Sequence, residues 1–151
     1  MDLLAGESGH ATPKMDVRGV LPRDDAVLLV KERDDGLWSL SGGWAEVGES
    51  PKESVTRELL EESGFRVEVS RLLAVWDRSR HELAPYPFLV YTLVFLCRLT
   101  GETPLDNLET SEAAFFPKNE LPELSTYRVN PAQLHRVFRI CDDGALPAEL
   151  D

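Results

Sequence analysis

The sequence has 151 residues, of which 42% are hydrophobic and 28% charged, a composition typical of one globular domain. A chain of this length can bury a hydrophobic core without a disulfide or a structural metal. The net charge of −11 argues against duplex nucleic acid or an anionic membrane as the main partner. It leaves a small anionic substrate open, because a bound metal neutralises such a substrate locally.

The cysteines and the apolar stretches indicate where in the cell the protein is expected. Cys97 lies within an apolar run and Cys141 follows one, so we expect two buried free thiols in a reducing cytosol. The longest apolar run, residues 88–97, is too short to cross a bilayer. Residues 1–14 do not follow the charged-then-apolar pattern of a secretory signal. These features favour a cytoplasmic protein without a membrane segment.

The first third of the chain is expected to form strands after a flexible lead-in. Residues 1–14 hold Gly, Ser, Thr and Pro without periodicity, which is typical of a flexible segment. Residues 17–21 and 26–31 are predicted strands joined by a turn, and residues 37–40 form a short third strand. The pair Gly42-Gly43 is then expected to break the pattern.

The middle of the chain contains a strong helix signal. Ser50 can cap the helix, Pro51 suits its first turn and Glu53 completes a capping box. The helix is predicted to run from Pro51 to about Ser63, with Gly64 as a left-handed C-terminal cap.

The second half predicts two long strands, residues 67–76 and 87–99, and a short strand at residues 113–116. A second helix should begin at Asn130-Pro131, with Gln133 completing its cap. Its apolar residues recur at helical spacing and should face the core.

Strands therefore outnumber helices, with one helix in mid-chain and one near the end. This order predicts a mixed β-sheet covered by helices, an α/β (α+β) fold. We expect one domain over residues 15–142 and a polar tail, residues 143–151, that frays.

Three carboxylates share one face of the first predicted helix. Glu58, Glu61 and Glu62 lie within one turn, in the C-terminal half, where the helix dipole disfavours negative charge. A solvated acidic face is the usual interpretation of such a cluster. Here Val55 and Leu59 place a buried stripe beside it, so a bound divalent cation is favoured. Carboxylate oxygens suit Mg²⁺ or Mn²⁺ better than Zn²⁺.

The same cluster predicts an unusual pKa for at least one of its carboxyl groups, and an arginine stands beside it in the sequence. Protonating one of the carboxylates relieves their repulsion, so at least one should have a raised pKa without metal. Arg57 lies four residues from both Glu53 and Glu61 and can hold carboxylates in fixed rotamers, with a surface salt-bridge ladder as the alternative. Gly42 and Gly43 can let the backbone approach a metal or phosphate, although a glycine pair alone indicates only a turn.

The whole segment resembles a known motif, the Nudix box G-x5-E-x7-R-E-U-x-E-E-x-G-U, in which U is a bulky apolar residue. Every spacing fits, and the one loose position is an aromatic residue where an aliphatic one is more usual. The matching residues are Gly43, Glu49, Arg57, Glu58, Leu59, Glu61, Glu62, Gly64 and Phe65. The resemblance extends over residues 15–142 and implies the Nudix fold, a mixed sheet sandwiched between helices.

The resemblance also implies a metal site. Glu58 and Glu62 would be the principal ligands of Mg²⁺, with Glu61 as a further ligand directly or through water, and the backbone carbonyl near Gly43 joining them. Without metal, the three carboxylates are expected to face an open cleft. In enzymes of this kind Mg²⁺ ions bridge the substrate phosphates and orient a water, and a carboxylate accepts the water's proton.

Other residues of the motif would support this site. Glu49, Arg57 and Gly64 would hold the loop and helix together. Nudix enzymes often take one more carboxylate from a later loop, as base or ligand. Glu109 and Glu112 are the candidates in this sequence, and a solvated loop is the alternative for each.

Strings outside the box resemble one bacterial subgroup, the ADP-ribose pyrophosphatase-like proteins, which include CDP-choline pyrophosphatases. These strings are DVRGV, LWSLSGGWAEVGE, LLAVWDRSRH, and ETSEAAFFPKNELPELS followed by Arg128. Members generally have an additional N-terminal helical domain, which this sequence does not show, and tend to have proline at the position of Ser41. By analogy with this subgroup we expect a homodimer.

Six residues outside the catalytic glutamates are candidates for contact with substrate. Guanidinium groups bind phosphate oxygens bidentately, and an indole can stack on a base. Surface charge and core packing are the respective alternatives, and a lone histidine is usually structural. The candidates are Arg18, Trp44, Asp77, Arg78, His81 and Arg128.

Three functions stay open at this point. The first is Mg²⁺-dependent hydrolysis of the pyrophosphate bond in a nucleoside diphosphate linked to another group, with ADP-ribose and CDP-choline as first candidates. The second is hydrolysis of damaged nucleoside triphosphates, and the third is a catalytically silent domain that binds a nucleotide. The intact glutamate cluster argues against the third, since a silent domain has no need to hold repelling carboxylates together.

Overall fold

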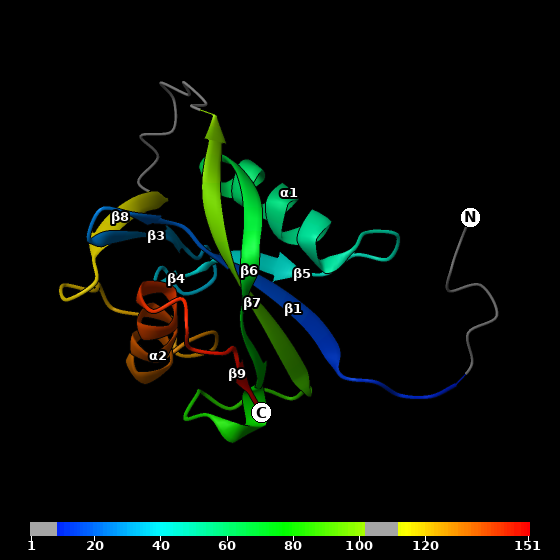
Figure 1. Ribbon diagram of the computed structural model, residues 1–151. Helices are drawn as coiled ribbons and strands as arrows, with labels where there is room; N and C mark the ends of the chain where they lie inside the picture. Colours follow the sequence, from blue (N-terminus) through cyan, green and yellow to red (C-terminus); the bar gives the residue numbers. More distant parts are fainter. Residues whose placement is uncertain (1–8, 102–111) are drawn as a thin grey trace.

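The strands form two sheets in the computed structural model of the chain, which describes residues 9–101 and 112–151 (Figure 1). The larger sheet has the order β5 (Ser41–Trp44), β1 (Lys14–Val20), β7 (Val90–Gly101), β6 (Arg66–Asp77) and β9 (Glu149–Leu150). The smaller contains β2 (Pro22–Arg23), β3 (Ala26–Lys31), β4 (Trp38–Ser39) and β8 (Ala113–Pro117). In the larger sheet β1 is parallel to β7 and β6 to β9, and the other pairs are antiparallel, so the predicted mixed sheet is confirmed.

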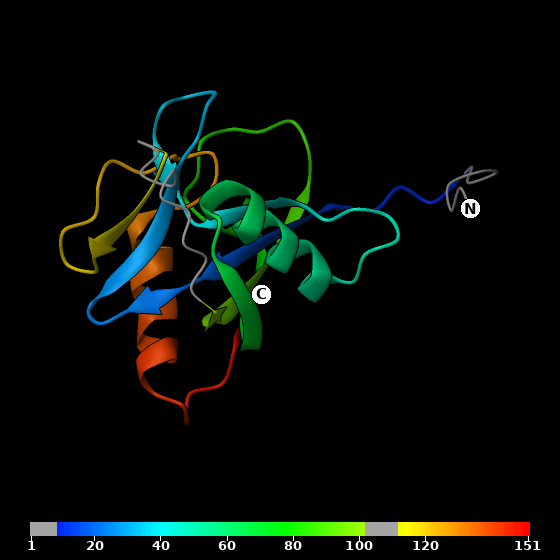
Figure 2. The same ribbon diagram turned by 90° about the horizontal axis from the view of Figure 1, so that it is seen from above.

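Two helices cover opposite faces of the strands, α1 (Pro51–Ser63) and α2 (Pro131–Asp142) (Figures 1 and 2). Val17 of β1 packs with Val55 and Leu59 of α1 on one face. Val20 of the same strand joins the cluster that contains Leu134 and other apolar residues of α2 on the other face. The alternation of strand side chains thus gives each helix its own core, and the predicted sandwich is confirmed.

Both helices begin as their sequences predict. The Ser50 hydroxyl accepts the Glu53 N–H at 3.2 Å, and the Glu53 carboxylate accepts the Ser50 N–H at 3.0 Å. Asn130 and Gln133 form the equivalent box at α2. Gly64 ends α1 with φ 75° and donates its N–H to the Leu60 carbonyl, as a left-handed cap does.

The Gly42-Gly43 pair does not break the strand pattern, which corrects the sequence-based expectation. Both glycines lie in β5, where Gly42 pairs with Arg18 and Gly43 with Val17 of β1. A Cβ added at Gly42 would stand 1.9 Å from the Val17 carbonyl oxygen. The glycine is needed because the two backbones approach too closely for any side chain.

The C-terminal tail does not fray, contrary to expectation. Its residues form β9, which runs parallel to β6 through the pairs Ala74–Glu149 and Val75–Leu150. The Asp151 N–H also donates to the Val75 carbonyl at 3.1 Å. The polar composition of the tail was misleading because its carboxylates find partners on β6 and α2, and the tail sequence alone does not indicate these contacts.

The remaining expectations concern the lead-in and the thiols. Residues 1–8 lie outside the described part of the chain, and β1 begins at Lys14. Cys97 is buried as predicted, whereas Cys141 is half-buried, and both are free thiols. Within the described residues, neither helix is long and apolar enough to span a membrane.

Candidate active site

The acidic face of α1 lies against strand β5. The Glu62 carboxylate accepts two hydrogen bonds from this strand, from the Ser41 hydroxyl and from the Gly42 N–H, each at 2.8 Å. Glu58 lies one turn earlier on the same face, and a Cβ added at Gly43 would stand only 2.9 Å from its Oε1. The two glycines therefore let a backbone strand and two carboxylates meet without an intervening side chain.

Burial changes how these two carboxyl groups titrate. It raises the pKa of Glu62 to about 7, against the opposing effects of the Ser41 hydrogen bond and the Arg18 charge. Burial also raises the pKa of Glu58, and the neighbouring Arg57 works in the opposite direction. The predicted raised pKa is thus present, but its main cause is desolvation rather than repulsion among the glutamates.

Arg57 ties the loop before α1 to the acidic face. Its Nε donates to both carboxylate oxygens of Glu49, at 3.1 and 3.0 Å, and its Nη1 donates to Glu58 and Glu61 at 3.2 Å each. The hydrogen bond from Arg57 also holds the pKa of Glu49 below its usual value. The contact with Glu53 that the helical spacing allowed is not formed, because Glu53 is used in the capping box.

The three glutamates do not converge on one point. Within residues 9–101 and 112–151, no group of three or more Asp, Glu, His or Cys side chains is placed to hold a metal ion. Glu58 turns toward Arg57 and Gly43, Glu62 toward β5, and Glu61 has a side chain that is 59% exposed. The expected open cleft shared by all three is therefore not observed. Protein donors reach one carboxylate oxygen of each glutamate, Oε1 of Glu58, Oε2 of Glu61 and Oε1 of Glu62.

The donor chemistry nevertheless fits a hard divalent cation. The candidate side-chain ligands are carboxylate oxygens beside the backbone of β5, and oxygen donors are what Mg²⁺ and Mn²⁺ prefer. The exposed Glu61 side chain is held by Arg57, four residues away, and it could turn toward a bound ion without leaving a buried position.

A cavity of about 360 Å³, which we call the acidic cavity, opens beside these glutamates. Glu61 and Glu62 line it together with Glu112, which follows the segment that the structure does not describe. Glu112, one candidate for a base or ligand from a later loop, thus lines the same cavity as Glu61 and Glu62, whereas Glu109, the other, lies outside the described residues. The full lining consists of Val30, Lys31, Glu32, Arg33, Asp34, Glu61, Glu62, Glu112 and Arg128.

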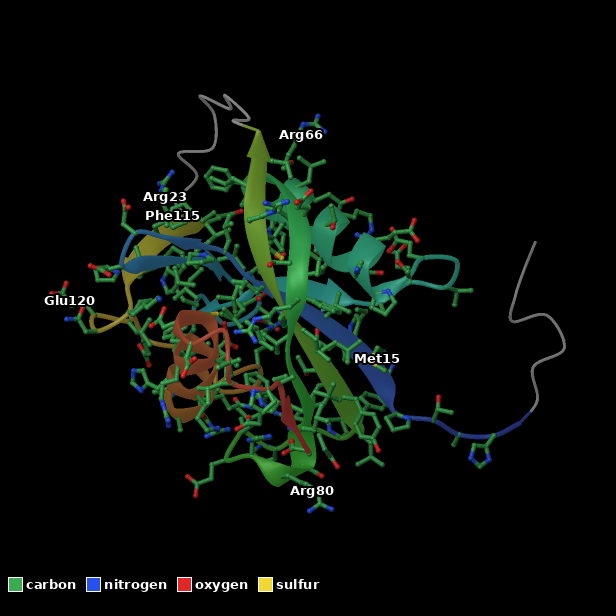
Figure 3. The ribbon with its side chains drawn as sticks, viewed as in Figure 1. Met15, Arg23, Arg66, Arg80, Phe115 and Glu120 are labelled. Carbon is green, nitrogen blue, oxygen red and sulfur yellow. The ribbon has the colours of Figure 1, made fainter. Side chains whose placement is uncertain are left out.

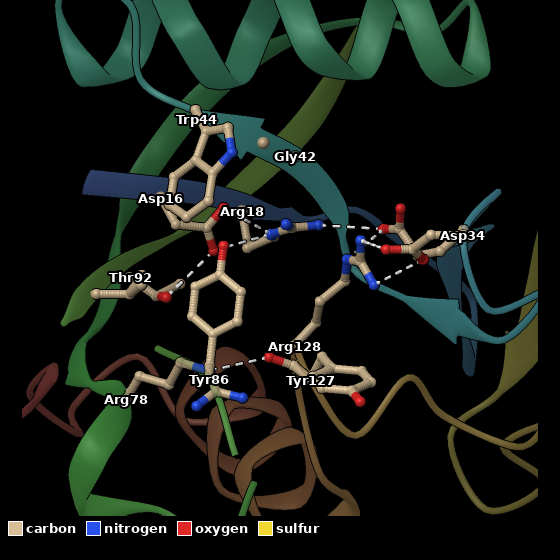
Figure 4. A pocket seen from close by; sticks show the side chains of 13 residues that line it. Asp16, Arg18, Asp34, Gly42, Trp44, Arg78, Tyr86, Thr92, Tyr127 and Arg128 are labelled. Carbon is tan, nitrogen blue, oxygen red and sulfur yellow. Dashed lines mark hydrogen bonds and ion pairs between the residues drawn. The ribbon is translucent and has the colours of Figure 1, made fainter. Parts of the chain in front are cut away.

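A second cavity of about 460 Å³, which we call the aromatic cavity, adjoins the first (Figure 4). Three aromatic side chains, Trp44, Tyr86 and Tyr127, contribute to its lining. Glu32, Asp34 and Arg128 line both cavities and connect them. The other lining residues are Asp16, Arg18, Gly42, Gly43, Arg78, Val90 and Thr92.

Of the two arginines predicted to contact phosphate, Arg128 lies at this junction and Arg18 lines the aromatic cavity, and both are already paired. Arg18 donates from Nε to Asp16 at 3.0 Å and from Nη1 to the Leu40 carbonyl at 3.0 Å. Arg128 pairs with Asp34 at 2.9 Å and with Glu32 at 3.4 Å. A phosphate bound by either guanidinium would share it with these carboxylate partners.

Trp44 and Arg78 also line the aromatic cavity. Trp44 is 46% exposed, so its ring is available to a ligand. Arg78 donates from Nε to the Tyr127 carbonyl at 3.0 Å and from Nη2 to the Ala84 carbonyl, and its guanidinium lies 5.1 Å from the Tyr86 ring centre. Arg78 therefore supports two aromatic side chains of the wall.

Asp77 and His81 are not brought to either cavity. The Asp77 carboxylate accepts the Ser79 N–H at 3.0 Å and caps the short 3-10 helix η1 (Arg78–Arg80). His81 Nε2 lies 2.6 Å from the Asp151 carboxylate. Both side chains are thus engaged in contacts within the protein, and their contact with substrate stays a prediction.

Several lining residues were missed by the sequence reasoning. Asp16 stands two residues before Arg18 on the same face of β1, a spacing that could have indicated the pair. Glu32 accepts a hydrogen bond from Ser39 at 2.6 Å across the β3–β4 turn, and no sequence pattern indicates this contact. Tyr86 and Tyr127 lie on separate loops, which only the fold brings together.

Comparison with known proteins places this arrangement in a family. Residues 13–138 match the NUDIX domain family. YjhB of Bacillus subtilis (strain 168), provisionally named as an ADP-ribose pyrophosphatase, is 47% identical over 137 residues, which cover 91% of this chain and 66% of YjhB. An ADP-ribose pyrophosphatase of Methanocaldococcus jannaschii is 32% identical over 116 residues, covering 75% of this chain and 67% of that protein. The chain thus spans about two thirds of the length of these relatives.

Solved structures agree with the sequence relatives. A UDP-X diphosphatase superposes with a TM-score of 0.85 at 35% identity, covering 99% of this chain and 72% of the other. An ADP-ribose pyrophosphatase from Streptococcus suis 89-1591 gives a TM-score of 0.78 at 34% identity, covering 93% and 100%. With the family match over most of its length, the Nudix-box helix and the mixed sheet between two helices, this chain belongs to the NUDIX domain family.

Proposed function

We propose that this protein is a metal-dependent hydrolase that cleaves the pyrophosphate bond of a nucleoside diphosphate linked to another group. The observation that carries the proposal is the junction of the two cavities. A carboxylate-lined cavity suited to metal and phosphate shares Glu32, Asp34 and Arg128 with an aromatic cavity suited to a planar base. The names of the relatives, ADP-ribose pyrophosphatase and UDP-X diphosphatase, describe substrates of this chemical type.

Mg²⁺, or Mn²⁺ in its place, is the proposed cofactor, held by Glu58, Glu62 and Glu61 beside the backbone of Gly43. Bound there, the ion would neutralise phosphate charge and lower the pKa of a water molecule. Glu62 supplies its carboxylate from α1, and the Ser41 hydroxyl and the Gly42 N–H of β5 fix its orientation. Arg57 fixes Glu58 in the same way through its Nη1.

The other residues bind and orient the substrate in this proposal. Trp44 and Tyr86 offer aromatic faces to a nucleobase, and Arg128 stands between the base and the carboxylates. Glu112 is the proposed proton acceptor, because it lines the acidic cavity with Glu61 and Glu62.

A substrate panel with product analysis tests the proposal. ADP-ribose, CDP-choline, a UDP-linked sugar and an oxidised deoxynucleoside triphosphate are incubated with the protein and Mg²⁺, and the products are separated by chromatography. We expect a nucleoside monophosphate and a phosphorylated second fragment from one of the first three. Release of inorganic pyrophosphate from the triphosphate alone would instead identify a hydrolase of damaged nucleotides. Binding of these compounds without turnover would identify a silent nucleotide-binding domain.

A further inference from the structure

The C-terminal strand joins three parts of the molecule through one chain of polar contacts. The Asp151 carboxylate accepts the Asp77 N–H at 2.9 Å and lies 2.6 Å from His81 Nε2. Arg136 of α2 lies 3.3 Å from His81 Nδ1 and donates from Nε to Glu149 at 2.6 Å. Strand β9, helix α2 and the start of the loop after β6 are thereby connected.

These contacts are partly shielded from water. The side chains of His81 and Asp151 are only 10% and 19% exposed. The His81 ring also lies 5.7 Å from the Trp76 ring, and the Trp76 indole N–H donates to Glu149. Partly buried hydrogen bonds that involve charged groups are stronger than exposed ones, so this end of the loop is firmly held.

The same loop, residues 78–89, forms one wall of the aromatic cavity. It carries Arg78 and Tyr86, which both line that cavity (Figure 4). A connection of this length between two antiparallel strands is longer than usual and needs tertiary contacts to stay ordered. On one side it is held by Arg78 and by the hydrogen bond from the Ala84 N–H to Thr126, and on the other by His81 and Asp151.

We propose that Asp151, His81 and Arg136 are positioning residues that clamp this loop and so preform the aromatic wall for substrate. The inference rests on the proposed function, since it assumes that a nucleotide enters the aromatic cavity. A loop released from the clamp must be ordered again when substrate binds, which weakens binding. The carboxylates on α1 are held by separate contacts with β5 and Arg57, so the turnover of bound substrate is retained.

Paired variants at Asp151 test the clamp. Asp151→Ala removes the acceptor for His81 and for the Asp77 N–H, whereas Asp151→Asn keeps an oxygen that can accept either. With Mg²⁺ and the substrate that the wild type hydrolyses fastest, Asp151→Ala should raise KM roughly tenfold and leave kcat within about twofold. Asp151→Asn should keep KM near the wild-type value. Glu120→Ala, on an exposed residue away from both cavities, is the matched control.

Limited trypsin digestion gives a readout that does not depend on activity. The side chain of Arg80 within the loop is 72% exposed (Figure 3), so release of the loop should accelerate cleavage after this residue in Asp151→Ala but not in Asp151→Asn. His81→Phe keeps a ring beside Trp76 while losing both hydrogen bonds, and it should behave like Asp151→Ala. If Asp151→Ala does not fold, His81→Phe decides the question with the same two measurements.

The outcomes separate the clamp from the proposed function. If Asp151→Ala and His81→Phe both show the wild-type KM and the wild-type rate of cleavage after Arg80, the proposal that these residues clamp the loop is overturned. If kcat falls together with thermal stability while KM is unchanged, these residues have a merely structural role, and the clamp proposal is also overturned. If the wild type hydrolyses no member of the panel, the proposed function fails, and the trypsin digestion alone then decides whether the loop is clamped.

Discussion

Ser41 shows how one residue tunes the candidate metal site. The subgroup that the sequence resembles tends to have proline at this position, and proline has no hydroxyl to donate. Here the buried Ser41 hydroxyl donates to Glu62 at 2.8 Å and lowers the pKa of that carboxyl group against the effect of burial. The sequence shows serine at this position, but it does not show that the hydroxyl contacts Glu62, which lies 21 residues later on α1.

Replacing Ser41 by alanine should weaken metal binding near neutral pH. Without the hydroxyl, the pKa of Glu62 should rise above about 7, so a metal ion must displace a proton from more of the molecules. We expect a several-fold loss of apparent Mg²⁺ or Mn²⁺ affinity at pH 7, measured by calorimetry, that shrinks at pH 9. Equal affinities of variant and wild type at pH 7 would show that the hydroxyl does not tune Glu62.

The raised pKa of Glu62 also predicts how pH and metal act together. Burial favours the protonated form, but the ligand form is the carboxylate, so apparent Mg²⁺ affinity should strengthen as pH rises through about 7. The water nucleophile must also lose a proton, which places the activity optimum at about pH 8–9. Rate measured against pH should therefore be steeper at subsaturating than at saturating Mg²⁺. Parallel profiles at the two concentrations would mean that the ligands are already ionised.

At the scale of elements, local sequence signals predicted both helices well. Their caps use residues three positions apart, such as Ser50 with Glu53, so the information lies within one turn. The Gly42-Gly43 pair was misinterpreted because its reason is a neighbouring strand, not a turn. Glycine pairs ordinarily mark turns, so the local sequence did not indicate that this pair lies inside a strand.

Gly42→Ala should disrupt the pairing of β5 with β1. The added Cβ would meet the Val17 carbonyl oxygen at 1.9 Å, and a backbone atom cannot move aside as a flexible side chain can. We expect a loss of about 1–3 kcal/mol or more in the free energy of unfolding, measured by urea denaturation. Gly144→Ala is the matched control, since an added Cβ there meets no atom within 4 Å. Equal stability of the two variants would contradict the close approach.

At the scale of the whole molecule, sequence and structure contribute different parts of the site. The Nudix-box helix could be predicted from the sequence because its functional residues are periodic on one element. The aromatic cavity could not, because Trp44, Tyr86 and Tyr127 come from three separate segments that only the fold assembles. The clamp on the C-terminal strand was hidden for the same reason, since His81 and Asp151 are 70 residues apart.

The homodimer expected from the subgroup stays a prediction at this scale. Sedimentation velocity at micromolar concentration should show a single species of twice the 16.9 kDa chain mass. A monomer as the main species would overturn this expectation and leave the proposed chemistry untouched.

The central claim is that glutamates on one face of α1 hold the metal that drives hydrolysis. The most direct measurement is the Mg²⁺-dependent turnover of the wild type beside Glu58→Gln and Glu62→Gln, with the exposed Glu120→Gln as control. Each α1 variant should keep its fold by circular dichroism and lose roughly 10²–10³ in rate, the usual effect of removing a preorganised electrostatic group. Turnover near the wild-type value in either α1 variant, with the same Mg²⁺ dependence, would remove that glutamate from the site and contradict the account.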